Sequence, residues 1–196
     1  MKAESEEYAL EIMGVDTGFK TSIKKALLSR SWDVVTLQQA SHFSAFPDTY
    51  TPYIEELAKY IRELCPKAKI YIHQTWAYEE ASARLASMKF EHRSDMFAAV
   101  KSSYELAAER IFADGIIPSG EVVERLTELG VEKVHRDTFH IDLGVGRYAL
   151  ALTWAKTLFG LESVANSFSE FDVPVTDEER AIAERAVQEI CASYAK

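Results

Sequence analysis

Long apolar runs and targeting signals are missing from this chain of 196 residues. No stretch approaches ~18 consecutive apolar residues, the length that a membrane-spanning helix needs. The first residues, MKAESEEYALEIM, are acidic and lack the apolar segment of a signal peptide. We therefore expect a soluble protein that stays in the cytoplasm and has no membrane partner.

Cysteine and positive charge are also scarce. The two cysteines, Cys65 and Cys191, are too few and too far apart in sequence for a disulfide framework, and we expect both to be core thiols. Lys and Arg number 22 against 31 Asp and Glu, which gives a net charge of −9. Because no basic tract offsets this balance, nucleic acid is not expected as a partner.

Motifs for metals and nucleotides are missing as well. The five histidines show no metal-ligand spacing such as H-E-x-x-H, so we expect no metal site. Gly144-Val145-Gly146 lacks the preceding strand and the third glycine of a dinucleotide fingerprint. The sequence therefore predicts no cofactor, and it disfavours a flavodoxin-like protein that binds a nucleotide.

Apolar, patterned sequence is what the chain has in quantity. Hydrophobic residues make up 47% of it and aromatic residues 11%, which is ample for a core. At ~100–200 residues per domain, the length favours a single domain over residues 1–196. Short apolar and β-branched runs predict strands at 8–13, 32–39, 69–75 and 116–118, the first of them broken by Gly14 and Gly18.

Helices are expected between and after these strands, from their apolar stripes and end signals. They cover residues 21–30, 52–65, about 90–113, 121–129, the segment that ends at Gly160, and the segment after 176. Thr21 and Thr51 are the predicted N-caps of the first two, and Asp114-Gly115 is predicted to end the third. Thr176 and Glu179 predict a capping box for the last.

Strands that alternate with helices predict a parallel sheet with helices on both faces. Ligands of such sheets bind at the carboxyl ends of the strands. Several polar and aromatic residues should gather at that edge: Gln38, Gln39, Ser41, His42, His73, Trp76, Ser119, Asp137 and His140.

Asp137 and His140 have the spacing Asp-x-x-His just before an apolar helical stripe. A carboxylate three residues before a histidine can accept its Nδ1 proton and fix the ring as a general base. In the other interpretation, Asp137 caps backbone amides in a loop that leads into a helix, and His140 is a half-buried polar side chain. The pair alone favours this second interpretation.

Four segments together resemble a known family. WDVVTLQQASH, IYIHQTWAYE, IIPSGEVV and RDTFHIDLGVGRYALALTW resemble, in order and spacing, the later sequence blocks of the SGNH (GDSL-type) hydrolases, in a bacterial branch of unknown substrate. The resemblance covers most of residues 21–160. It implies a flavodoxin-like three-layer α/β/α fold and a serine esterase, a carboxylic ester hydrolase that acts on small-molecule or glycan acyl esters.

The resemblance also implies roles for individual residues. His140 corresponds to the base and Asp137 to the residue that orients it. Gln38 or Gln39 stands where the family supplies an oxyanion-hole side chain, usually as Asn. His73, at a predicted strand end, is either a pocket residue or a satisfied polar group of the core.

The family's first block, a strand that ends in a turn with the nucleophilic serine, is not visible before Thr21. The chain therefore resembles the carboxyl-terminal part of a longer hydrolase without its first strand, helix and strand, and we expect little or no esterase activity. Ser167, within ANSFS, resembles the missing turn, but its short polar approach favours an ordinary surface loop. The alternative function is a non-catalytic α/β domain that forms a homodimer or binds a partner through the open edge at 34–38.

Overall fold

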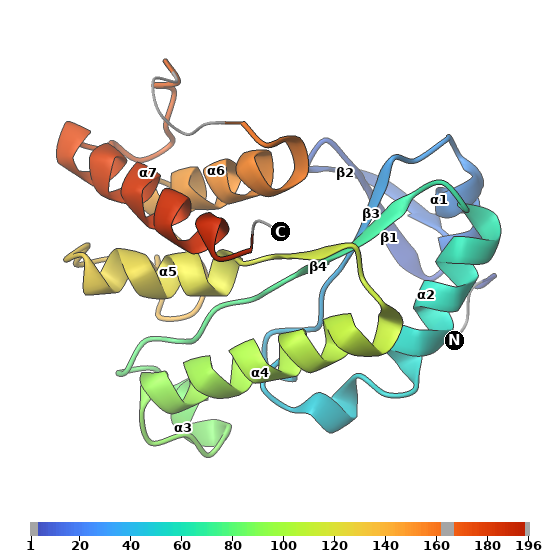
Figure 1. Cartoon of the computed structure of the whole chain (residues 1–196), viewed down its shortest axis with the longest axis horizontal. Coiled ribbons are helices and arrows are strands. Elements are labelled where there is room, and N and C mark those ends of the chain that lie inside the picture. The colour runs from blue at the N-terminus through green and yellow to red at the C-terminus, as the bar shows by residue number, and fades with distance from the viewer. Residues whose placement is uncertain (1–3, 162–166, 195–196) are drawn as a thin grey trace.

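The computed structural model of the chain describes residues 4–161 and 167–194 (Figure 1). Three parallel strands form its main sheet in the order β3-β4-β5: β3 (Val34–Leu37), β4 (Lys69–His73) and β5 (Gly115–Ile117). All three lie within the segments predicted from their β-branched residues, apart from the first residue of β5. The predicted α/β class with a parallel sheet is therefore confirmed.

Helices cover both faces of this sheet (Figure 1). One layer holds α2 (Tyr53–Leu64) and α4 (Arg93–Ile111), and the other holds α5 (Ser119–Glu128), α6 (Val145–Phe159) and α7 (Asp177–Ala192). The short helices are α1 (Ile23–Leu28), the 3-10 turn η1 (Pro47–Thr49) and α3 (Ala83–Ser87). This is the three-layer α/β/α arrangement that the sequence predicted.

Each layer has its own apolar core. The first is built around β4, whose Ile70 and Ile72 are each 1% exposed, and around the buried Tyr104 of α4. The second joins α5, α6 and α7 through buried residues such as Leu126 and Ala149. Cys65 and Cys191 are both buried thiols, as expected.

The strand β3 lies at one edge of the sheet. It pairs with β4 in parallel register, with Leu37 opposite Ile72, and among the described strands it has no neighbour on its other side. Its four residues are all only half-buried. No helix within the described residues is both long and apolar enough to cross a membrane.

The amino-terminal segment differs from the prediction. β1 (Tyr8–Ile12) and β2 (Val15–Thr21) form an antiparallel hairpin, whereas Gly14 and Gly18 were expected to end the extended structure. The two turn residues, Met13 and Gly14, have φ angles of 54° and 76°. Positive φ at both positions is typical of the tight turn that joins hairpin strands, so Gly14 reverses the chain and the extended structure continues.

Both predicted N-caps are wrong. Ser22 caps α1 by accepting a hydrogen bond from the amide of Lys25 (3.1 Å), because Thr21 is still the last residue of β2. The Thr51 hydroxyl donates to Glu55 Oε1 (3.1 Å), and α2 begins one residue after Pro52 without a side-chain cap. The capping box of α7 is confirmed, since Thr176 and Glu179 exchange both hydrogen bonds.

The end of α4 is also earlier than predicted. The helix stops at Phe112, which adopts a left-handed conformation with φ 49°. Asp114 does not end the helix but stabilises the sheet, because its carboxylate accepts a hydrogen bond from the amide of Ile70 in β4 (2.8 Å). At the other end, His92 is the N-cap residue, so Phe90 lies outside the helix.

Candidate active site

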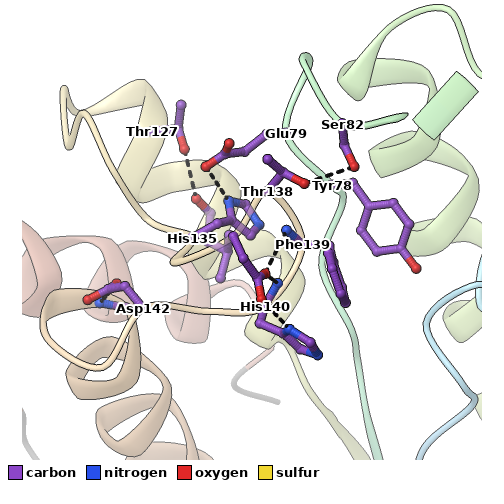
Figure 2. A network of polar contacts seen from close by, with 12 residues as sticks. Tyr78, Glu79, Ser82, Thr127, His135, Thr138, Phe139, His140 and Asp142 are labelled. Atoms are coloured by element: carbon purple, nitrogen blue, oxygen red, sulfur yellow. Dashed lines mark hydrogen bonds and ion pairs between the residues drawn. The ribbon is translucent and has the colours of Figure 1, made fainter. Parts of the chain in front are cut away.

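The loop that leads into α6 carries a hydrogen-bonded histidine and aspartate. His140 Nδ1 lies 2.8 Å from Asp137 Oδ2, and the backbone amide of His140 donates to Asp137 Oδ1 (2.9 Å; Figure 2). The bond from the imidazole and the bonds from backbone amides lower the pKa of Asp137 to about 2. Asp137 is therefore charged and can only accept, so Nδ1 donates and the other ring nitrogen, Nε2, is left as a base.

Both side chains of this pair reach solvent, with 51% of His140 and 44% of Asp137 exposed. A base in this position can receive a proton from a molecule that arrives from outside. Within residues 4–161 and 167–194, no serine hydroxyl is hydrogen-bonded to His140.

The segment after β4 fixes the backbone of this loop from one side. Trp76 Nε1 donates to the carbonyl oxygen of Phe139 (2.8 Å), and the amide of Glu79 donates to the carbonyl oxygen of Thr138 (2.8 Å). The Thr138 hydroxyl donates to Ser82 Oγ (3.1 Å; Figure 2). Thr138 has φ 75°, an unfavourable value for a β-branched residue, and these bonds hold it there.

Ring contacts hold the same loop. Phe139 lies with its ring centroid 3.9 Å from that of His140 and 5.7 Å from that of Tyr78. The guanidinium carbon of Arg84 lies 3.8 Å from the centroid of the Phe139 ring. Phe139 therefore connects the base to side chains that follow β4 in the sequence.

A second histidine anchors the loop from inside. His135 is fully buried, its Nε2 lies 3.1 Å from the carbonyl oxygen of Ala77, and its Nδ1 lies 3.5 Å from Glu79 Oε1 (Figure 2). Burial, helped by the positive charge of Arg93, lowers the pKa of His135 to about 4. His135 is therefore neutral near pH 7 and acts as a structural residue of this loop. No pattern in the sequence predicted this role for His135.

Asp142, two residues before the N-cap residue Gly144, caps the first amides of α6, a role that was not predicted from the sequence. Its two carboxylate oxygens accept hydrogen bonds from the amides of Gly144 (2.6 Å) and Gly146 (2.7 Å). A Cβ atom on Gly146 would lie 2.4 Å from Asp142 Oδ2, so this close approach needs glycine. The signal in the sequence was an aspartate just before a glycine pair that opens an apolar stripe. Asp137 accepts hydrogen bonds from the amides of Phe139 and His140 in its own loop and also contacts the His140 ring.

Gln39 and Gln38, the predicted oxyanion-hole residues, differ in their surroundings. The Gln39 amide group braces its own loop, since Nε2 donates to the carbonyl oxygen and hydroxyl of Thr49 (both 3.2 Å) and Oε1 accepts from the amide of Ala40 (2.9 Å). The Gln38 side chain is exposed and lines a cavity at the end of β3.

His73 pairs with a buried serine at the ends of β4 and β5. Its Nε2 lies 2.9 Å from Ser119 Oγ, and its ring contacts Trp154 edge-on at 4.9 Å. Burial lowers the pKa of His73 to about 4. Ser119 is fully buried. His73 itself is half-buried, and these contacts are compatible with a satisfied polar group, one of the two interpretations that the sequence left open.

Ser167 lies in the exposed segment between α6 and α7, and the two residues before it in the ANSFS motif fall outside the described residues. Among the described contacts, none joins Ser167 to His140. The described part of the chain also contains no cluster of three or more His, Cys, Asp or Glu side chains that could hold a metal ion.

Comparison with known proteins places the chain among related sequences. A family model described as "Domain of unknown function (DUF4886)" matches residues 5–189. The crystal structure of a DUF4886 family protein from Bacteroides uniformis ATCC 8492 is 28% identical with a TM-score of 0.80, over 88% of this chain and 67% of that chain. A structure described as that of a "putative GDSL-like lipase" from Parabacteroides merdae ATCC 43184 is 17% identical with a TM-score of 0.48, over 66% of this chain and 61% of that chain. The comparison with curated proteins gave no match.

Proposed function

We propose, for a chain that belongs to the DUF4886 family of unknown function, that its site performs ester hydrolysis of the SGNH type, with His140 as general base and Asp137 as the residue that orients it. The observation that carries the proposal is the 2.8 Å contact between His140 Nδ1 and Asp137 Oδ2, which leaves Nε2 without a hydrogen bond among the described contacts, on a side chain that is 51% exposed. The resemblance of four sequence segments to SGNH hydrolases supports the same chemistry. The substrate would be an acyl or acetyl ester, either a small molecule or one carried on carbohydrate.

The proposed step is a proton transfer coupled to acyl transfer. As a hydroxyl oxygen bonds to the ester carbonyl carbon, Nε2 of His140 takes the hydroxyl proton, and the charged Asp137 stabilises the imidazolium that forms. When the carbon–oxygen bond to the leaving alcohol breaks, the imidazolium returns this proton to the alcohol. With water as the nucleophile, the products are the free acid and the alcohol.

We expect this reaction to be slow, because none of the described serines is hydrogen-bonded to His140. A serine-hydrolase site that has lost one member of its triad retains only about 10³–10⁴-fold acceleration over water. A fluorophosphonate probe tests the point, since it labels activated serines. We expect no stoichiometric labelling. Labelling of one serine that disappears in Ser167→Ala would show that Ser167 is the nucleophile and would contradict this part of the proposal.

A second candidate function is assembly without catalysis, and the open edge of β3 favours it. The edge presents unpaired backbone groups from Val34–Leu37, and residues 34–41 contain no charged side chain that would protect such an edge. A second copy of the chain is the proposed partner, and pairing of the two β3 edges would form one continuous sheet.

A further inference from the structure

A cavity of about 540 Å³ opens beside the carboxyl end of β3, between the sheet and α2. Leu37 and Ile72 line it from two paired strands, and Ile54 and Leu57 line it from α2. Phe43, 47% exposed, lies on its outer side. The volume falls within the range of ~300–1,000 Å³ that is usual for small-molecule sites.

The chemistry of this lining selects an apolar ligand. None of its described residues carries a charged side chain, so a charged group placed deep inside would lose its hydration without a partner. The Gln38 side chain, exposed and without a hydrogen bond among the described contacts, can serve a polar group at the mouth. The lining therefore suits an alkyl chain whose polar end remains at the surface.

The cavity and the candidate base belong to the same edge of the sheet, and a short series of contacts runs from the loop after β3, next to the cavity, to the base. Ser41, in the loop after β3, contacts the Tyr78 hydroxyl at 2.9 Å. The Tyr78 ring packs edge-on against Phe139, whose ring lies tilted against that of His140. A ligand whose alkyl chain occupies the cavity and whose polar end meets Gln38 would place that polar end at the carboxyl edge of the sheet, the edge that also holds the His140 loop.

We propose that this cavity binds the acyl chain of an unbranched, medium-length carboxylic ester, and binds the corresponding free acid as the product. The inference rests on the proposed function, which it extends by naming the substrate class. Leu37, Ile54, Leu57 and Ile72 contact the chain, and Gln38 donates a hydrogen bond to the ester or carboxylate oxygen.

Calorimetric titration with butanoate, hexanoate, octanoate and decanoate tests the proposal on the full chain without any need for turnover. Each added methylene should strengthen binding about fourfold until the cavity is filled. Leu57→Trp, which fills the cavity, should weaken octanoate binding at least about tenfold. The matched control is Leu64→Trp, two turns later on α2 and outside the lining, which should leave binding unchanged.

Gln38→Ala provides a variant at an exposed position, where folding is not at risk. It should weaken binding of every acid by a similar factor and leave the dependence on chain length intact. Affinity that does not rise with chain length, or equal losses in Leu57→Trp and Leu64→Trp, would overturn the proposal. So would the absence of acid binding together with a dimer that Leu57→Trp dissociates, because a second copy would then fill the cavity.

The two proposals can fail separately. If acids do not bind but hydrolysis of a short acetyl ester depends on His140, the cavity assignment alone is wrong. If acids bind with the expected chain-length dependence but no hydrolysis depends on His140, the cavity assignment stands and the proposed function is wrong.

Discussion

Trp76 donates a hydrogen bond from its indole Nε1 to the carbonyl oxygen of Phe139 at 2.8 Å, directly before the candidate base His140 in the sequence. The contact joins residues 63 positions apart, one just after β4 and the other in the loop before α6. It ties the backbone next to the imidazole to the segment that follows β4, and it gives Trp76 a role in positioning His140.

Trp76→Phe should therefore reduce any hydrolysis that depends on His140. The change removes the donor, leaves the Phe139 carbonyl unpaired, and should cost about 1 kcal/mol of unfolding free energy. Trp32→Phe is the matched control, because Trp32 Nε1 also donates to a backbone carbonyl, that of Ala26 (3.1 Å), but in another part of the fold. Urea unfolding should show similar losses for both variants, whereas only Trp76→Phe should lower the ester hydrolysis rate.

Asp137 and Asp142 should separate catalysis from stability. Asp142→Ala removes the cap of α6 and should lower the unfolding free energy by about 1 kcal/mol. Asp137→Asn should reduce the His140-dependent hydrolysis, because the neutral side-chain amide of asparagine orients the imidazole less well than the charged carboxylate and does not stabilise the imidazolium. Thermal unfolding and initial rates measured on both variants check this. Equal effects of the two changes on the rate would remove the distinction between cap and orienting residue.

Stability should fall as the pH falls from about 6.5 toward 4. Burial lowers the pKa values of His73 and His135 to about 4 from an ordinary value of 6.5. Between these pH values the unfolded chain binds protons that the folded chain does not, so each histidine contributes a slope of up to about 1.4 kcal/mol per pH unit. Above pH 6.5, neither histidine makes the unfolding free energy depend on pH.

Urea unfolding at intervals between pH 7 and pH 5 measures this slope, at pH values where Asp137, with its pKa lowered to about 2, does not titrate. His73→Gln should flatten the dependence, since the glutamine amide still contacts Ser119 but takes up no proton. A slope that His73→Gln does not reduce would contradict the assignment.

The open edge of β3 predicts self-association. Light scattering should give about twice the 22.1 kDa mass of one chain at moderate concentration. Thr36→Lys should shift the equilibrium toward monomer, since a charge on the edge opposes strand pairing. Thr127→Lys, the same change at a half-buried threonine of α5, should not. A wild-type chain that stays at 22.1 kDa over the accessible concentration range would count against the dimer.

Local sequence signals account for most of the fold. The β-branched runs located β3, β4 and β5, and the reciprocal Thr176–Glu179 pair located the start of α7. Each of these features depends on residues that are close together in the sequence. The hairpin escaped prediction because its turn, Met13-Gly14, does not match the Asn-Gly or Asp-Gly pairs that usually mark such turns.

The candidate site was predictable only in its local part. Asp137 and His140 meet because they are three residues apart on one turn, a contact that their spacing allows but that the pair alone did not favour over a capping role for Asp137. The bonds from Trp76 and Glu79 to the same loop depend on how two loops meet at the edge of the sheet, which no short pattern encodes. The capping role of Asp142 had a local signal, the glycine pair that follows it, but Asp137 lies in the same loop and was the aspartate considered for that role.

Hydrolysis of p-nitrophenyl acetate near pH 7 tests the central claim most directly. The wild-type chain should exceed the buffer blank, His140→Ala should remove this excess, and a general base contributes about 10²-fold or more to such a step. His42→Ala controls for the reaction of any exposed imidazole with this ester and should retain the wild-type rate. Equal rates for the wild type, His140→Ala and His42→Ala would contradict the assignment of His140 as the base.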